Sequence, residues 1–333
     1  MASGRPDVNP LLRRATILRW TGSGSLADLQ SSVEHIMGLE GLKGKAKRSG
    51  NSLVVAGPEP ARTCSVFRHL PGVSWLAAGY AVEGSFGLAA AAEELAKRYL
   101  RRGGRFGVEA ESAGGPAASD IAGAVTSHLL DAAKGARASP QPPRTTFRVA
   151  VDASGGAAGV ELSRGPGGIP TGRDRAYCLV SGGKHSSVMA WQAVLMGYRV
   201  RLVHAVEDDE GLLAAARLYS ELSFRSDPRG LSLTAIEGGP AARLLRGFAS
   251  EADGPVFCGL TAKKALADWP PESGVAMPLY LLSEEWFDSE FRGLDLEARE
   301  SALGWGKGGT TKARSKSFGG RRADVSEVLD GLS

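Results

Sequence analysis

Residues 177–191 read YCLVSGGKHSSVMAW, and this stretch decides how the rest of the chain is interpreted. A short apolar run predicts a buried strand, a Gly-Gly turn follows it, and the next residues have a helical pattern. Gly182 and Gly183 lack a Cβ, so the backbone of the turn can approach a phosphate group closely. The start of the helix adds unpaired N–H groups and the positive end of a helix dipole. These residues alone support a phosphate-binding turn and a purely structural turn equally well.

The pattern around this turn is one of alternating strands and helices. From Arg173 to about Leu282, short apolar segments are separated by segments of helical periodicity near 186–197, 210–223, 240–252 and 261–268. The expected strands are YCLV, RVRLVHAV, LSLTAI, PVFCGL and VAMPLYLL. This order predicts an α/β fold, a doubly wound parallel sheet with helices on both faces. Such sheets bind ligands at the carboxyl ends of their strands, where the Ser-Gly-Gly turn lies.

The residues before this sheet have an α+β pattern in two parts, 1–79 and 80–170. In the first part, strands flank an amphipathic helix, and the stretch GLKGKAKRSGN (41–51) is expected to be a loop. In the second part, a helix ends near Tyr99, and the segments TTFRVAVDA and AGVELSR are expected to pair as a hairpin. The Gly- and Pro-rich stretch GPGGIPTG (165–172) marks the boundary before the parallel sheet.

Two groups of basic residues stand out in these parts. The first group is Lys43, Lys45, Lys47 and Arg48, and the second is Lys97, Arg98, Arg101, Arg102 and Arg105. We expect them to form a basic surface that contacts the phosphate backbone of an RNA. The second group also has a local explanation, because cations complement the negative end of a helix dipole.

The overall composition bounds the class of protein. The chain has 333 residues, a net charge of +4 and no apolar stretch of the roughly 18 residues that a membrane-spanning helix needs. Its three cysteines form neither a disulfide framework nor a zinc pattern, so a cytoplasmic location is expected. The positive charge favours an anionic partner and does not identify it.

The C-terminal segment 301–333 has a different composition. Its central stretch GWGKGGTTKARSKSFGGRR carries six Lys and Arg residues, no acidic residue and many small polar ones. We expect a basic flexible tail that adds no core to the fold. It either contributes contacts to RNA or is a solubilising segment.

Together these features resemble the tRNA 4-thiouridine synthetase family. The likeness is carried by the linker GPGGIPTG, by the Ser-Gly-Gly turn after it, and by the order of the expected elements. It implies a ferredoxin-like domain (1–79), a THUMP RNA-binding domain (80–170) and a PP-loop domain of the adenine nucleotide alpha hydrolase-like fold (171–300). It also implies tRNA as a partner, ATP for adenylation of a uridine, and a sulfur donor protein.

The resemblance also implies roles for single residues of this chain. The family's loop reads Ser-Gly-Gly-x-Asp-Ser and holds the pyrophosphate of ATP; the residues that match it here are Ser181, Gly182, Gly183 and Ser186. Lys184 takes the variable position, and His185 stands where the family has aspartate. Mg²⁺ prefers oxygen ligands, so we expect weak ATP binding that depends little on Mg²⁺, and no metal site is assigned. The resemblance also places His204 and Gly259 near the nucleotide, although His204 is as well explained as a capped strand end.

Two further features leave alternatives open. Cys178 and Cys258 are expected on neighbouring strands, so they are either a sulfur-carrying pair or buried small side chains. Residues 207–209 are either substitute magnesium ligands or the acidic start of the next helix.

Two other classes of RNA-modifying enzyme are excluded because the chain lacks their motifs. The chain has no Asn/Asp-Pro-Pro-Tyr motif of a methyltransferase, and no His-x-Glu with Pro-Cys-x-x-Cys of a zinc deaminase. The remaining functions are an ATP-dependent tRNA thiolating enzyme and a tRNA-binding protein with a catalytically silent PP-loop domain. A nucleotide sensor that ignores tRNA is a third function, of a different class.

Overall fold

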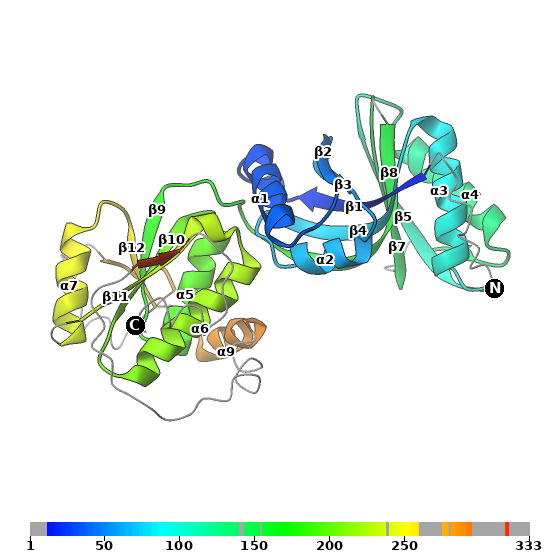
Figure 1. Ribbon diagram of the computed structural model, residues 1–333. Helices are drawn as coiled ribbons and strands as arrows, with labels where there is room; N and C mark the ends of the chain where they lie inside the picture. The colour runs from blue at the N-terminus through cyan, green and yellow to red at the C-terminus, as the bar shows by residue number, and fades with distance from the viewer. Residues whose placement is uncertain are drawn as a thin grey trace, which may run out of the picture. The chain divides into compact units, whose positions relative to one another are not determined.

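The chain divides into two compact units, Met1–Gly168 (unit 1) and Ile169–Ser333 (unit 2). The computed structural model describes residues 12–139, 143–153, 155–237, 240–259, 275–279, 281–294 and 317–319. Figure 1 shows the elements of each unit. None of the helices described is long and apolar enough to span a membrane.

Unit 1 contains an eight-stranded sheet in the order β2-β3-β1-β4-β8-β7-β5-β6. Its strands are β1 (Leu12–Trp20), β2 (Lys45–Ser49), β3 (Ser52–Ala56), β4 (Val73–Val82), β5 (Arg105–Ala113), β6 (Arg137–Ala138), β7 (Thr145–Asp152) and β8 (Gly155–Gly167). Its helices are α1 (Leu26–Leu39), α2 (Pro60–Phe67), α3 (Gly84–Tyr99) and α4 (Ala118–Ala132). The expected hairpin is confirmed, because β7 and β8 pair antiparallel.

The sheet of unit 1 is continuous across the position where the sequence separates the first two domains. Residues 79 and 80 both lie inside β4, which pairs with β1 on one side and with β8 on the other. At this point β4 and β8 approach closely, since a Cβ on Gly79 would lie only 2.0 Å from the carbonyl oxygen of Ala158. A small apolar cluster joins strands of both parts: Ala15, Ile17, Val54, Ala77, Ala150 and Ala157.

The helices of unit 1 pack on one face of the sheet in two groups. Successive side chains of a strand point to opposite faces, so on β1 Leu18 packs with α1 and α2, whereas Ile17 belongs to the small cluster on the other face. Helices α3 and α4 cover a second core that includes Leu95, Leu129 and Phe147.

The segment 41–51 is not the simple loop that the sequence predicts. Residues 45–49 form β2, which pairs antiparallel with β3 at the edge of the sheet. Lys45, Lys47 and Arg48 are exposed on this strand. The backbone pairing with β3 makes this polar segment a strand, and its charged side chains hinder pairing of the sheet edge with other chains.

Unit 2 contains the predicted parallel sheet, in the order β13-β12-β9-β10-β11-β14. Its strands are β9 (Arg175–Leu179), β10 (Arg199–Ala205), β11 (Leu231–Ile236), β12 (Val256–Cys258), β13 (Val275–Ala276) and β14 (Ser317–Gly319). Its helices are α5 (Lys184–Leu195), α6 (Asp209–Arg225), α7 (Ala241–Glu251), α9 (Glu284–Gly293) and the 3-10 turn η1 (Pro228–Gly230). The pairings from β13 to β11 are all parallel, which confirms the predicted fold class.

The sixth strand of this sheet corrects the expectation for the tail. Ser317–Gly319 pairs antiparallel with β11, with Phe318 opposite Leu233. These three residues therefore belong to the sheet, where the sequence predicts a flexible segment. The other residues of the tail, and the helix expected at 261–268, lie outside the described residues.

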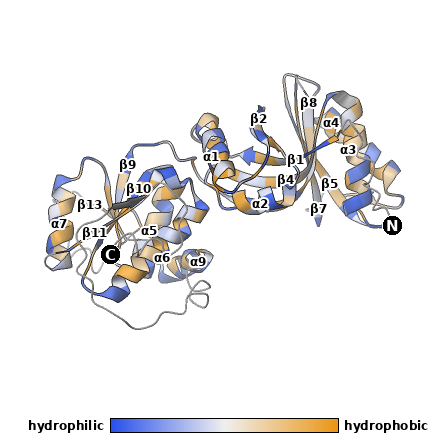
Figure 2. Cartoon of the chain, viewed as in Figure 1, coloured by the Kyte–Doolittle hydropathy of each residue, from blue (hydrophilic) through white to orange (hydrophobic). Residues whose placement is uncertain are grey.

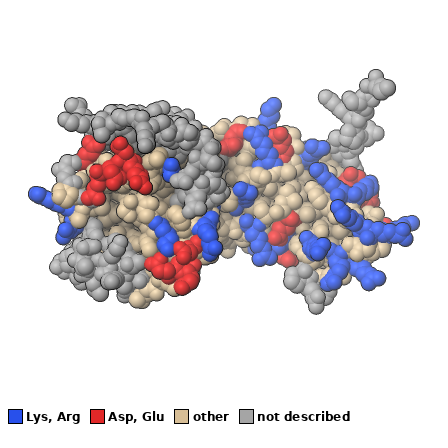
Figure 3. All heavy atoms as spheres, turned by 90° about the horizontal axis from the view of Figure 1, so that it is seen from below, with Lys and Arg blue, Asp and Glu red and all other residues tan. Residues whose placement is uncertain are grey.

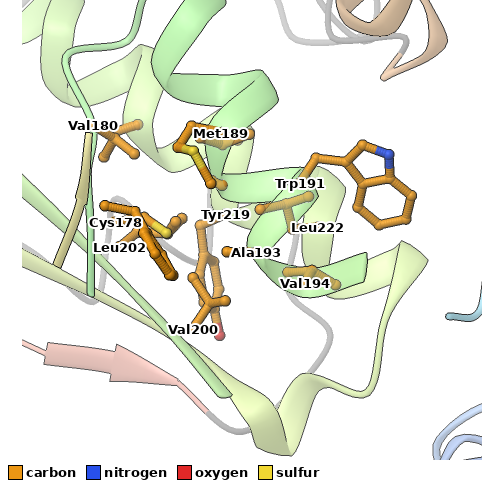
Figure 4. Close-up of a cluster of buried hydrophobic side chains, with 14 of the residues drawn as sticks. Cys178, Val180, Met189, Trp191, Ala193, Val194, Val200, Leu202, Tyr219 and Leu222 are labelled. Atoms are coloured by element: carbon orange, nitrogen blue, oxygen red, sulfur yellow. The ribbon is translucent and has the colours of Figure 1, made fainter. Parts of the chain in front are cut away.

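The sheet of unit 2 has helices on both faces. Helices α5, α6 and α9 pack on one face, around a core that contains Cys178, Met189, Leu202 and Tyr219 (Figure 4). Helix α7 packs on the other face, where Phe248 meets Tyr177. Helix α7 carries both hydrophobic and hydrophilic residues, as expected of an amphipathic helix with one side toward the sheet (Figure 2).

Candidate functional site

The Ser-Gly-Gly turn lies where the strand order of unit 2 reverses. Chain order runs from β9 outward to β10 and β11, and then returns to β12 on the other side of β9. This is the topological switch point at which open α/β sheets bind ligands. Gly182 has a φ of +78°, and a Cβ there would lie 2.7 Å from that of Ala214, so the turn requires glycine at this position.

Ser186 shapes the turn from inside. Its Oγ donates a hydrogen bond to the carbonyl oxygen of Gly183 over 2.9 Å, and the backbone N–H of Ser181 donates to the same Oγ over 3.3 Å. The side chain of Ser186 is buried, so it holds the loop closed. No described side chain caps the first turn of α5, which leaves its amide groups available to an anion.

Gly259 follows β12 and lies against the start of α5. A Cβ on Gly259 would lie 2.2 Å from the carbonyl oxygen of His185. The structure therefore brings two predicted residues from distant parts of the chain together at one end of the sheet.

Lys184 and His185 are held by the acidic helix α9. Lys184 Nζ lies 2.7 Å from Glu284 Oε2 and 2.6 Å from Asp288 Oδ1, and His185 Nε2 lies 2.8 Å from Glu284 Oε1. The His185 ring also meets Phe287 edge to face, with 4.4 Å between ring centroids. Hydrogen bonds from Lys184 and His185 lower the pKa of Glu284, and those to Asp288 and Glu284 raise the pKa of Lys184.

These acidic partners were not predicted from the sequence. Glu284 lies about a hundred residues beyond Lys184, and acidic residues at the start of a helix are ordinary complements of its dipole. Lys184 and His185 in this turn are thus already hydrogen-bonded to carboxylates of α9.

His204, predicted near the nucleotide, is buried at the end of β10. Its Nδ1 lies 2.8 Å from the carbonyl oxygen of Val180, the residue before the turn, so Nδ1 carries the proton. Burial lowers the pKa of His204 and favours the neutral ring. Its Nε2 is buried and has no hydrogen-bond partner among the described residues. A Cβ on Gly211 would lie 3.4 Å from this nitrogen, so the ring edge faces the start of α6.

The acidic residues 207–209 do not form a metal site with their described neighbours. Asp208 caps α6 by accepting a hydrogen bond from the N–H of Gly211 over 2.7 Å, and Asp209 begins that helix. Among the residues that the structure describes, no group of three His, Cys, Asp or Glu side chains is placed to hold a metal ion.

The cysteines are buried, and the two in unit 2 face opposite sides of the sheet. Cys178 belongs to the core under α5 and α6, whereas Cys258 belongs to the core under α7. Burial raises the pKa of the Cys178 thiol, and it raises the pKa of Cys64 in unit 1 to about 12. The reactive form of cysteine is the thiolate, so these positions favour the interpretation as buried small side chains.

Four of the nine predicted basic residues of unit 1 line one of two separate cavities. Lys45, Lys47 and Arg48 line a cavity of about 630 Å³ together with Arg13, Glu83 and Asp152. We call this cavity the basic groove. Figure 3 shows one face of the molecule, on which Lys and Arg side chains spread over unit 1.

The second basic group is placed differently. Arg98, near the end of α3, lines a smaller cavity of about 190 Å³ with Arg14 and Arg62. Arg13 and Arg14 are neighbours on β1 and point to opposite faces of the sheet, so the two cavities lie on opposite faces. Arg101 and Arg102 follow α3 and are exposed. Residues of the two basic groups therefore line different cavities, and their common role in RNA binding stays a prediction.

The fold can be compared with solved structures. No protein-family model and no curated protein sequence matches the chain. The protein PH1313 from Pyrococcus horikoshii Ot3 superposes with a TM-score of 0.66 at 18% identity, over 85% of this chain and 99% of that one. A 4-thiouridine synthetase, solved in complex with RNA and ATP, superposes with a TM-score of 0.65 at 17% identity, over 96% of this chain and 94% of that one. The chain therefore has the multidomain fold of a 4-thiouridine synthetase.

Proposed function

We propose that this protein binds tRNA through unit 1 and an adenine nucleotide at the Ser-Gly-Gly turn of unit 2. The fold supports this proposal, since a protein of the same fold was solved with RNA and ATP. The proposal includes the division into ferredoxin-like (1–79), THUMP (80–170) and PP-loop (171–300) domains, and a cytoplasmic location.

The environment of His204 is the observation that supports nucleotide binding by unit 2. A buried acceptor without a donor costs about 1–3 kcal/mol, so a ligand donor that reached Nε2, which lies buried beside the start of α6, would be stabilised there. The exocyclic amine of adenine and the hydroxyls of ribose are such donors. Gly182 and Gly259 keep the turn free of side chains, and the amides of α5 would hold phosphates.

The described residues near the turn are not arranged to bind Mg²⁺. The position next to the turn carries His185, whose Nε2 is already paired with Glu284, and Asp208 and Asp209 serve the start of α6. Phosphate binding would therefore depend on backbone amides and on Lys184, released from the carboxylates of α9. We expect weak ATP binding with little dependence on Mg²⁺.

The basic groove supports the proposal that unit 1 binds tRNA. Lysine and arginine contacts to phosphates release counterions, so tRNA affinity should fall steeply with salt. The double variants Lys45→Glu/Lys47→Glu and Arg101→Glu/Arg102→Glu change two separate places. We expect each to weaken binding to many tRNAs alike, with additive losses in binding free energy.

The test of the whole proposal has two parts. Calorimetry with tRNA at several salt concentrations, and with ATP in the presence and absence of Mg²⁺, measures the two binding activities. Nucleoside analysis of tRNA from cells with and without the gene measures 4-thiouridine. A flat salt dependence together with unchanged affinity of both double variants would contradict RNA binding through unit 1.

A catalytically silent tRNA-binding protein is the second candidate. It is favoured by the pairing of His185 with Glu284 and by the burial of all three cysteines. His185→Asp restores the family's carboxylate beside Glu284 and should make ATP binding more dependent on Mg²⁺. Release of pyrophosphate from ATP with tRNA by the His185→Asp variant and not by the unmodified protein would support the silent candidate, whereas release by the unmodified protein would exclude it.

A further inference from the structure

The smaller cavity of unit 1 lies on the helix-covered face of the sheet, between the start of α2 and the end of α3. Its volume is about 190 Å³, and the residues that line it include Arg14, Glu59, Arg62, Arg98, Tyr80 and Tyr99. We call it the arginine notch. A water molecule takes about 30 Å³ in the liquid, so the notch has room for about six waters. It is smaller than the roughly 300 Å³ at which pockets for whole drug-sized ligands begin.

Three arginines from three different elements meet in the notch. Arg14 comes from β1, Arg62 from α2 and Arg98 from α3, and among the described residues Glu59 is the one acidic residue that lines the cavity with them. Three positive charges against one negative charge leave a net charge of +2. The notch is therefore complementary to a dianion.

These guanidinium groups retain donors for a ligand. Arg62 donates to Glu59 and to the carbonyl oxygen of Glu40, each over 3.1 Å. Arg14 makes a long contact of 3.4 Å to the carbonyl oxygen of Pro58, and Arg98 lies 5.4 Å from the centroid of the Tyr99 ring. Each guanidinium has five N–H groups in a planar fork, which suits the oxygens of a phosphate.

The start of α2 adds backbone donors to the same notch. Its N-cap residue, Glu59, makes no side-chain capping hydrogen bond, and Pro60 occupies the first turn. The first N–H groups of a helix have no partner within the helix, so those of Ala61 and Arg62 are suited to an anion. The rings of Tyr80 and Tyr99 form the remaining wall, and aromatic rings stack on bases and sugars.

We propose that the arginine notch binds a phosphomonoester carried on a nucleotide. A terminal phosphate has a charge of about −1.5 to −2 at pH 7, which matches the notch better than the single charge of a phosphodiester. The group comes either from the 5′ end of an RNA or from a free mononucleotide. The RNA form of this inference rests on the proposed function, whereas the mononucleotide form does not.

The RNA arm of the test compares one RNA with a 5′-phosphate and with a 5′-hydroxyl. The unmodified protein should bind the 5′-phosphate form about tenfold more tightly, as expected for charge-assisted hydrogen bonds. Arg14→Gln/Arg98→Gln should abolish this preference. Arg13→Gln is the matched control on the same strand, because it points into the basic groove and should weaken both RNAs equally.

The nucleotide arm measures the affinity for AMP and adenosine by calorimetry. AMP binding that Arg14→Gln/Arg98→Gln removes belongs to the notch, whereas binding at the turn of unit 2 is unaffected by this variant. Ala61→Glu is a second variant, since a carboxylate in the first turn of α2 should fill the notch and still stabilise the helix. Thermal melting of each variant checks that unit 1 remains folded.

The outcomes separate this inference from the proposed function. Loss of the 5′-phosphate preference, or of AMP binding, in both notch variants supports the inference. If no RNA binds at all, the proposed function fails and the AMP arm decides alone. The inference is overturned if neither arm distinguishes the notch variants from the unmodified protein.

Discussion

Gly259 lies so close to His185 that an added Cβ would be 2.2 Å from the His185 carbonyl oxygen. It would also be 2.7 Å from the backbone nitrogen of Ser186. The end of β12 therefore supports the first turn of α5 directly, beside the Ser-Gly-Gly turn. This contact joins the two strands between which the order of the sheet reverses.

Gly259→Ala should displace the start of α5, because neither backbone can yield freely in a packed core. We expect a loss of about 1–3 kcal/mol in the free energy of unfolding and weaker ATP binding. Denaturant unfolding and calorimetry measure the two effects. Gly247→Ala in α7 is the control, since its Cβ would have open space and alanine favours a helix. Unchanged ATP affinity in Gly259→Ala would separate this contact from the nucleotide site.

The carboxylates of α9 should compete with a nucleotide for Lys184. We expect Glu284→Gln/Asp288→Asn to increase ATP affinity several-fold, because the lysine is then free to contact phosphate. The change in stability should be small, because solvent screens exposed ion pairs. Glu290→Gln, on the same helix but bonded to Gln192, is the matched control in calorimetry. Weaker ATP binding by the double variant would mean that these carboxylates assist the nucleotide instead.

His204 should make unit 2 sensitive to acid. Burial lowers its pKa below the ordinary value of about 6.5, so near that pH the unfolded chain binds a proton that the folded chain does not. The free energy of unfolding should therefore fall as the pH drops below about 6.5, by at most about 1.4 kcal/mol per pH unit. Denaturant unfolding at pH 7.5 and 5.5 should show this loss, and His204→Gln should reduce it. An identical loss in the variant would assign the acid sensitivity to other groups.

β14 should contribute to the stability of unit 2. Replacing residues 317–319 with Gly-Pro-Gly removes the backbone donor of residue 318 and lowers the β propensity, whereas Thr-Val-Thr preserves both. We expect the first replacement to lower the melting temperature by about 2–4 °C for each kcal/mol lost, and the second to leave it nearly unchanged. Equal melting temperatures would agree with the flexible tail that the sequence predicts.

The sequence determined the elements whose signals are local. The alternation of short apolar strands with helices specifies the parallel sheet of unit 2, and the glycines of the turn specify a sharp connection after β9. The hairpin of β7 and β8 was predictable for the same reason, because its pattern and its partner are adjacent in the chain. Composition alone suggested that residues 41–51 and 317–319 lack regular structure, and pairing with β3 and β11 overrides it.

The tertiary structure decided which side chains meet. Glu284 reaches Lys184 from a helix about a hundred residues later, and a local pattern carries no information about such a distant partner. Arg13 and Arg14 are adjacent in the sequence, yet the alternation of a strand sends them into different cavities on opposite faces of the sheet. The buried Nε2 of His204, which has no partner among the described residues, likewise follows from how β10, α6 and the end of β9 pack. Sequence periodicity thus fixes the elements, whereas the chemistry of the candidate sites depends on contacts that form only when distant segments pack together.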